Sequence, residues 1–177
     1  FTDLGSRAYA FHGTSDKYVT EKIMAFLQNS QANIITIHLG NGCSITAVKE
    51  GKSVDTSMGF GPLSGLVMGT RSGDIDPSII FHLVNQLGYS LEQVNTLLNK
   101  NSGMQGLTGF SDMRDILKAM AAGDEHAELA YEIYAYRIKK YIGAYAAVLN
   151  GLDAIVFTAG VGKNDATIRR LVCEQMD

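Results

Sequence analysis

The chain has 177 residues, of which 46% are hydrophobic and 19% charged, as expected for a folded globular domain with a substantial core. The net charge is −3 and the two signs are interspersed, which argues against a nucleic-acid-binding patch and against a basic anchor for a membrane surface. Cys43 and Cys173 lie far apart without a CxxC pattern. We therefore expect free thiols in a reducing cytoplasm, neither of them a nucleophile or a metal ligand.

A first helix is predicted over residues 15–28, with Thr14 or Ser15 as its N-cap. Four apolar side chains recur there at helical spacing: Val19, Ile23, Phe26 and Leu27. His12 lies in the turn before this helix, where a histidine is most often a capping or packing group. Because a helix N-terminus offers free N–H groups to an anion, His12 is also a candidate anion contact.

Three consecutive strands are predicted over residues 34–38, 44–48 and 53–56, forming an antiparallel meander. Asn41-Gly42 lies between the first two strands, and this dipeptide is the usual signal of a type I′ hairpin turn. The glycines around Asn41 would alternatively leave backbone N–H groups free for phosphate oxygens.

A glycine-rich stretch over residues 59–77 follows the meander, with glycines at positions 61, 65, 69 and 73. Pro62 and the later charged residues exclude a closely packed membrane helix. A flexible surface loop is one interpretation. The other is an anion site, because Arg71 follows the glycines and a guanidinium can donate two parallel hydrogen bonds to a phosphate.

A helical section is expected next, beginning at Asp76-Pro77 and turning at Gly88. Its inward side chains are predicted to be Ile80, Leu83, Val84 and Leu87. Ser90 and Gln93 form a capping box for a second helix.

Residues 101–109 are predicted to be a loop, after which Ser111 or Asp112 begins a helix that ends at Gly123. A long helix is expected over residues 124–150. Its apolar stripe is wider than one neighbouring element needs, so the helix is expected at the centre of the core or at a subunit interface, and we favour the core.

The segment 154–158 is a continuous apolar run, as expected for a strand buried on both faces. It leads into a predicted glycine loop at 159–164 and then a further helix. A strand, glycine loop and helix in this order are typical of nucleotide contacts in α/β proteins. The segment matches neither the dinucleotide fingerprint nor the P-loop, since Lys163 is not followed by a hydroxyl residue.

Taken together, five motifs in uninterrupted order resemble the acetate kinase family over essentially the whole chain. They occupy residues 11–15, 37–42, 55–59, 65–77 and 158–164. The resemblance implies an α/β fold of the actin-like, ribonuclease-H-like ATPase class, with a three-strand meander, a further buried strand and packing helices. It also implies that residues 1–177 are part of the C-terminal nucleotide-binding domain of a two-domain kinase. The helical section would span about 77–123, and the N-terminal domain and a final segment would lie outside this sequence.

Acetate kinases transfer a phosphoryl group reversibly and in line between ATP and acetate, with Mg²⁺, giving ADP and acetyl phosphate. By resemblance, Arg71 and His12 are the catalytic pair that holds the transferring group. The implied nucleotide contacts come from three segments: His38, Leu39, Gly40, Asn41 and Gly42; Asp112, Met113 and Arg114; and Gly160, Val161, Gly162, Lys163 and Asn164. No metal ligand is assigned to this chain, since the resemblance puts most Mg²⁺ ligands in the other segments. It further implies a cytoplasmic homodimer that binds neither nucleic acid nor membrane.

Two positions depart from the family pattern. Asp16 replaces a histidine at a helix start, where aspartate is a good capping residue, so we expect no consequence. Lys163 replaces a glutamate in the nucleotide loop, and this reversal of charge puts nucleotide affinity or base preference in question.

Two alternatives to acetate kinase stay open. One is a kinase for propionate or another short acid, and the other is a non-catalytic ATP-binding or assembly module, which would not need Arg71 and His12. The chain alone is expected to turn over little or nothing.

Overall fold

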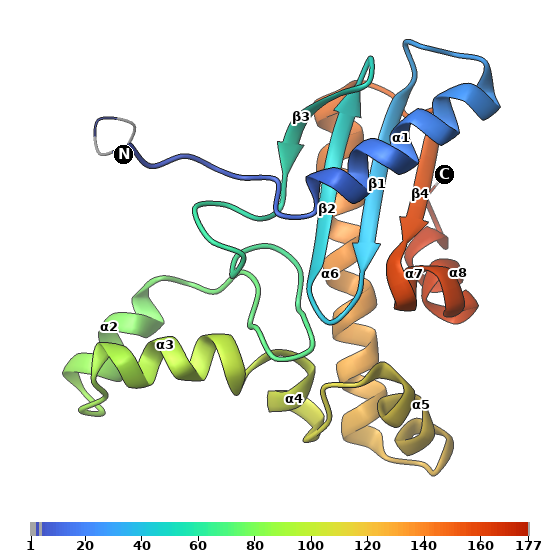
Figure 1. The fold of residues 1–177 in the computed structure, drawn as a ribbon. Helices are drawn as coiled ribbons and strands as arrows, with labels where there is room; N and C mark the ends of the chain where they lie inside the picture. Colours follow the sequence, from blue (N-terminus) through green and yellow to red (C-terminus); the bar gives the residue numbers. More distant parts are fainter. Residues whose placement is uncertain (1–2, 4, 177) are drawn as a thin grey trace.

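The computed structural model describes residue 3 and residues 5–176, and its centre is one four-stranded sheet of order β3-β2-β1-β4 (Figure 1). The first three strands form the predicted antiparallel meander, and β4 lies parallel to β1. The strands are β1 Asn33–Leu39, β2 Cys43–Lys49, β3 Lys52–Thr56 and β4 Ala154–Thr158. The parallel pairing brings the C-terminal end of β4 beside the C-terminal end of β1, where the candidate site lies.

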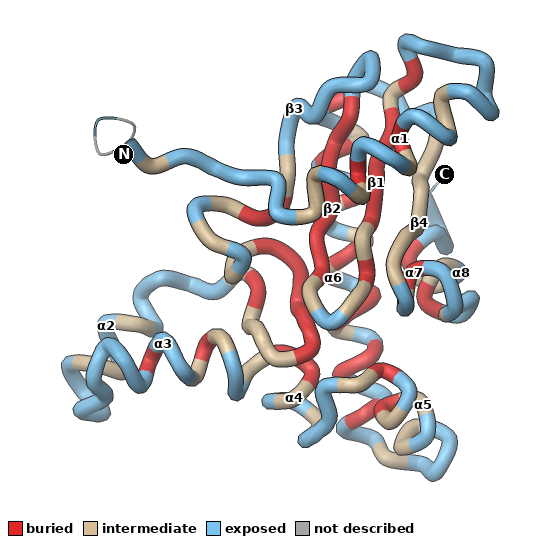
Figure 2. The backbone as a smooth tube through the Cα atoms, viewed as in Figure 1, coloured by how far each residue is buried: buried red, intermediate tan, exposed pale blue. Residues whose placement is uncertain are grey.

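The two faces of the sheet carry different helices, α6 (Glu125–Leu149) behind and α1 (Gly13–Leu27) in front (Figure 1). On the α6 face, alternate residues of β1 and β2 are apolar and fully buried against the helix. Figure 2 shows most of both strands as buried. The α6 side of this core includes Tyr131, Tyr134, Ile138, Ile142 and Leu149. The prediction that the long helix forms the centre of the core is therefore confirmed.

The α1 face of the sheet is polar near the ends of β1 and β2 that meet the turn, and this explains an error in the predicted helix. The helix begins at Gly13, two residues earlier than predicted, and His12 occupies the N-cap without a capping hydrogen bond from its side chain to the described backbone N–H groups of the helix. Its buried residues are Asp16 and Thr20, whereas Phe26, predicted to face inward, is 81% exposed. Apolar spacing missed Asp16 because the first turn of α1 covers the hydroxyl side chains of Thr36 and Thr46, whereas Ile23 packs against the apolar cluster of Ala32, Ile34 and Val48 as predicted.

The helical section contains α2 (Ser78–Asn85), α3 (Leu91–Lys100), α4 (Gly103–Thr108) and α5 (Met113–Ala121). The predicted capping box of Ser90 and Gln93 is confirmed. The predicted N-cap at Asp76 is one residue too early, since α2 begins at Ser78 with Pro77 as its N-cap, although an Asp76 oxygen accepts from the Ser78 N–H at 2.9 Å. The predicted loop at 101–109 is wrong, since α4 forms there. The four side chains predicted to face inward, three on α2 and Leu87 just after it, are at least partly exposed, because this segment lies away from the sheet (Figures 1 and 2).

Two predictions at the C-terminal end also need correction. Residues Ala159–Asn164 form a short helix, α7, followed by α8 (Ala166–Cys173), so the expected glycine loop is helical. Strand β4 is half-buried along its whole length, not buried on both faces, because it is the edge of the described sheet. No helix in the described part of the chain is long and apolar enough to cross a bilayer.

Candidate active site

The turn between β1 and β2 has a conformation other than the predicted type I′. None of the described residues 40–42 has the positive φ that a type I′ turn requires at both central positions. The turn closes through the Gly40 N–H, which donates to the Gly42 carbonyl at 3.1 Å, and the Gly69 N–H donates to the Asn41 carbonyl at 3.0 Å. A Cβ at Gly69 would lie 2.2 Å from Asn41 Oδ1, so glycine permits this approach. The glycine-rich stretch therefore packs against the turn and is hydrogen-bonded to it.

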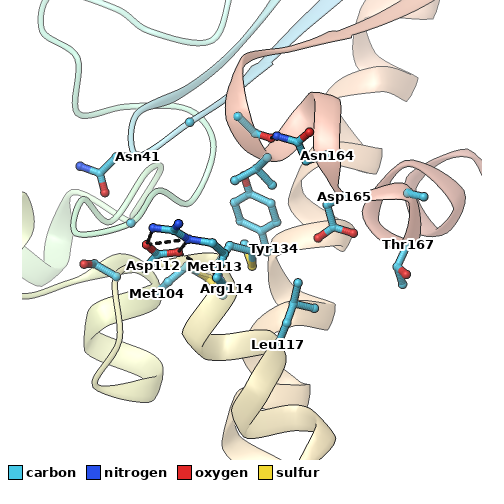
Figure 3. Close-up of a pocket in the computed structure, with 16 residues that line it drawn as sticks. Asn41, Met104, Asp112, Met113, Arg114, Leu117, Tyr134, Asn164, Asp165 and Thr167 are labelled. Carbon is cyan, nitrogen blue, oxygen red and sulfur yellow. Dashed lines mark hydrogen bonds and ion pairs between the residues drawn. The ribbon is translucent and has the colours of Figure 1, made fainter.

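A cavity of about 750 Å³ opens beside this turn (Figure 3). The structure brings three distant segments together at its wall, each of them predicted from sequence as a nucleotide contact. The predicted residues that line it are Gly40, Asn41, Asp112, Met113, Arg114, Gly160, Val161 and Asn164. A volume of this size is typical of small-molecule and cofactor sites.

Eight further residues that line the cavity were not predicted from the sequence: Gly69, Met104, Ser111, Leu117, Tyr134, Asp165, Ala166 and Thr167. Most come from helix faces that reach the cavity through tertiary packing, so no local motif marks them. Gly69 is the exception, since it belongs to the glycine-rich stretch.

The remaining predicted contacts do not line the cavity. Leu39 and Gly162 are buried in the packing beneath it, and Lys163 is exposed but lies outside the wall. His38 and Gly42 lie at the turn beside the candidate catalytic pair.

Asp112 and Arg114 form a bidentate ion pair at the cavity wall (Figure 3). Arg114 Nε donates to Asp112 Oδ1 at 3.0 Å, and Nη2 donates to Oδ2 at 2.5 Å. Hydrogen bonds from the Arg114 side chain and backbone lower the pKa of Asp112 to about 2. Because both side chains are solvent-exposed, the pair adds little to folding stability and its groups remain available to a ligand.

Tyr134 connects the cavity wall to the turn through Cys43. The Cys43 thiol donates to the Gly40 carbonyl at 3.3 Å, and the Tyr134 hydroxyl lies 3.1 Å from the same sulfur. Since the thiol has one proton, the tyrosine is the donor of the second bond. Burial raises the pKa of Cys43 to about 11, so it is a protonated structural thiol, as the sequence suggested. The predicted free thiols are confirmed, with Cys43 buried and Cys173 exposed.

Arg71 and His12, the predicted catalytic pair, meet at Gly42. A Cβ built on Gly42 would lie 2.4 Å from Arg71 Nη2 and 3.7 Å from His12 Cε1. Arg71 Nη1 donates to the Pro62 carbonyl at 2.5 Å, which leaves other donors of the guanidinium free to bind an anion.

His12 and His38 stack face to face, with ring centroids 3.9 Å apart and planes 10° from parallel. His12 Nδ1 lies 2.7 Å from Ser44 Oγ, and His38 Nδ1 lies 3.1 Å from Ser15 Oγ. Burial, His38 and Arg71 together lower the pKa of His12 to about 4. Burial also lowers the pKa of His38. His12 is therefore neutral at pH 7 until an anion approaches.

Asp16 is a buried carboxylate beneath these histidines. It accepts hydrogen bonds from Thr36 Oγ1 at 3.0 Å and Thr46 Oγ1 at 3.1 Å. Burial raises its pKa, against the opposing effect of both hydroxyls and of His38. The expectation that Asp16 is a capping residue was wrong, because its side chain points at the sheet.

Residue 3 and residues 5–176 contain no group of three or more His, Cys, Asp or Glu side chains that could hold a metal ion.

Comparison with known proteins gives concordant matches. The profile of the Acetokinase family matches residues 1–177. An acetate kinase of Flavobacterium johnsoniae is 60% identical over 176 residues, which cover 99% of this chain and 44% of that protein. The Carboxydothermus hydrogenoformans acetate kinase is 56% identical over 179 residues, covering 100% and 45%.

Two solved structures are similar in fold and sequence. The Porphyromonas gingivalis acetate kinase matches with a TM-score of 0.96 at 47% identity, over 99% of this chain and 45% of that one. A Francisella tularensis propionate kinase matches with a TM-score of 0.93 at 50% identity, over 96% and 44%. The predicted actin-like α/β fold is thus confirmed, and the chain spans about 44% of the length of the curated relatives that it matches. The chain belongs to the acetokinase family.

Proposed function

We propose that the protein containing this chain transfers a phosphoryl group between ATP and acetate, giving ADP and acetyl phosphate. The observation that carries the proposal is the convergence of Arg71, His12 and Gly42 at one end of a turn whose other residues, Gly40 and Asn41, line the cavity. This arrangement suits a nucleotide in the cavity with its terminal phosphate at the cationic end of the turn.

The chemistry needs cations and positioning more than a base. A carboxylate acceptor has a pKa near the ~4.3 of a glutamate side chain, so it is ionised at pH 7 and needs no deprotonation. In the proposed reaction an acetate oxygen bonds to the γ-phosphorus while the bond to the β-bridging oxygen breaks, and ADP leaves. Arg71 stabilises charge on the equatorial oxygens of the transferring group. His12 supplies a hydrogen bond to the same group, and an adjacent phosphate would raise its low pKa.

The cofactors of this proposal are ATP or ADP and Mg²⁺. When bound, Mg²⁺ would neutralise charge on the nucleotide phosphates, which usually supply several of its ligands. We assign no Mg²⁺ ligand to the described residues and propose that the protein ligands come from the rest of the kinase.

The proposal also names the carboxylic acid that accepts the phosphoryl group. Acetate is favoured by the names of the curated relatives, and a propionate kinase among the similar structures favours the alternative of a longer short-chain acid. Initial rates of the intact protein with acetate, propionate and butyrate distinguish them. We further propose that the protein is a cytoplasmic homodimer and that this chain alone has little or no turnover.

The test uses two variants of the intact protein, assayed for acyl phosphate formation and for Mg-ADP binding. Arg71→Ala is expected to lower kcat roughly 10³-fold or more, the magnitude typical of an arginine at a transferring phosphoryl group, with Mg-ADP affinity largely retained. Arg114→Ala, at the cavity wall, is expected to weaken Mg-ADP binding instead. Equal loss of turnover and affinity in Arg71→Ala would overturn its assignment. Robust acetate-dependent ATP consumption by the isolated chain would contradict the proposed inactivity.

A further inference from the structure

Ser44 is a buried hydroxyl residue that the proposed chemistry has not yet used. It lies at the start of β2, directly opposite His38 in the register of the sheet, and is 2% exposed. Its Oγ lies 2.7 Å from His12 Nδ1. Within the described residues, His12 is the hydrogen-bond partner of the Ser44 hydroxyl.

The single proton of this hydroxyl determines the direction of the bond. If Nδ1 carried a hydrogen and donated it to Oγ, the hydroxyl proton would be buried without an acceptor, which protein interiors rarely tolerate. The alternative satisfies both groups: Oγ–H donates, and Nδ1 accepts with its lone pair. A neutral His12 then carries its ring hydrogen on Nε2.

We infer that Ser44 is a positioning residue that holds His12 in the Nε2–H tautomer, so that this N–H is donated to the transferring phosphoryl group beside Arg71. The two ring nitrogens point in divergent directions, so fixing Nδ1 on the sheet directs Nε2 away from it. The carbon between them, Cε1, lies 3.7 Å from the position of a Cβ at Gly42, next to the guanidinium. In the opposite tautomer Nε2 would present a lone pair to a phosphoryl oxygen, and the two would repel.

His38 has a similar contact that provides an internal control. Its Nδ1 lies 3.1 Å from Ser15 Oγ, and Ser15 is only half-buried. Loss of the Ser15 hydroxyl therefore leaves the contact between Ser44 and His12 in place.

The tautomer can be measured on the isolated chain from the ¹⁵N shifts of the histidine rings at pH 7.5, assigned with a His12→Gln variant. The wild-type chain is expected to show His12 protonated at Nε2. Ser44→Ala is expected to populate the Nδ1–H form, and Ser15→Ala to leave the His12 signals unchanged. A His12 ring protonated at Nδ1 in the wild type, or an unchanged tautomer in Ser44→Ala, would overturn the inference.

The catalytic consequence rests on the proposed function and is measured on the intact protein. Ser44→Ala is expected to lower kcat by about ten- to a hundredfold, at or below the low end of the effects of acid–base and tautomer defects, because His12 itself remains. Ser44→Thr keeps the hydroxyl and should recover most of the rate. Mg-ADP affinity should be unchanged in both, because Ser44 is not part of the cavity wall.

The outcomes separate the two proposals. A shifted tautomer with an unchanged kcat would overturn the role of Ser44 in positioning His12 for transfer. An intact wild-type protein without carboxylate kinase activity would overturn the proposed function, while the ¹⁵N result would still decide the tautomer.

Discussion

The guanidinium of Arg71 lies where a side chain at position 42 would begin: a Cβ built on Gly42 would be 2.4 Å from Arg71 Nη2. Gly42→Ala is therefore expected to displace the Arg71 side chain, whose far end can move at little cost to folding. Turnover of the intact protein should fall by about ten- to a hundredfold, part of the effect of removing an arginine at this position. Because the cavity wall stays intact, Mg-ADP affinity should change much less.

Gly61→Ala is the matched control for this variant. A Cβ at Gly61 meets nothing within 4 Å, although the residue lies in the same glycine-rich stretch. We expect near wild-type kcat and affinity. If Gly42→Ala kept full activity, Arg71 would not need its observed position, and its assigned role would fail.

Asp16→Asn is expected to stabilise the chain at neutral pH. Burial raises the pKa of this carboxyl in the folded state above its unfolded value near 3.8. Between these two values the folded state binds more protons, so the stability contributed by the group falls as pH rises through the folded pKa. The advantage of the variant should therefore be small at about pH 3.5, where the carboxyl is protonated in the folded state and mostly protonated in the unfolded state, and should grow as the pH rises toward 7.

Urea unfolding of both chains from pH 3.5 to 7 measures this difference. The titration of His12 occurs in both proteins, whereas that of His38 is coupled to Asp16: the carboxylate raises the His38 pKa, so Asp16→Asn also removes this favourable interaction with a protonated His38. Asp115→Asn removes an exposed carboxylate paired with Lys118 and should change stability by no more than about 1 kcal/mol. A destabilised Asp16→Asn at pH 7 would mean that the two threonine hydrogen bonds outweigh the cost of burying the charge.

The sequence predicted well those features that depend on local chemistry. The three-strand meander follows from alternation and turns, and the caps at Ser90 and Asp112 follow from side chains that accept from N–H groups of their own helix. The position of α1 was not predictable in this way. Its buried positions, Asp16 and Thr20, face a polar sheet surface, whereas the helical pattern was sought among apolar residues.

The residues of the candidate site also differ in whether a local pattern in the sequence indicates them. Site residues in glycine-rich motifs could be predicted because a close approach of two backbone segments requires glycines, which are visible in the sequence. Tyr134 and Ser44 were missed because each acts through a partner far along the chain, Cys43 in one case and His12 in the other. A single tyrosine in a long amphipathic helix, or a serine in a strand, has no local pattern that indicates such a partner.

Two glycine substitutions should change stability in opposite directions. Gly103 has φ +61°, and a Cβ there would lie 2.2 Å from the Met68 carbonyl oxygen and 2.6 Å from that of Arg71. Gly103→Ala is thus expected to destabilise the chain by about 2 kcal/mol or more. Gly143 lies within α6 with nothing within 4 Å of its Cβ position, so Gly143→Ala should stabilise by about 0.5–1 kcal/mol. Thermal and urea unfolding measure both. A neutral Gly103→Ala would show that the backbone around Met68 relaxes readily.

Lys163→Glu tests whether the reversed charge in α7 affects the nucleotide. The Lys163 side chain is exposed and outside the cavity wall, while its carbonyl accepts from Arg169 Nη1 at 2.8 Å, an interaction that the substitution leaves in place. We expect Mg-ADP affinity of the isolated chain to fall by no more than about fivefold, since exposed charges contribute about 0–1 kcal/mol. The difference should disappear at 1 M salt, where the screening length is about 3 Å.

Asn164→Ala is the informative comparison for that titration. Asn164 lines the cavity and its Nδ2 donates to the Gly160 carbonyl at 2.9 Å, so its loss should weaken Mg-ADP binding at low and high salt alike. Were Lys163→Glu to behave in the same way, with a loss above tenfold that persists in high salt, Lys163 would contact the nucleotide directly. That result would require α7 to move toward the cavity when the nucleotide binds.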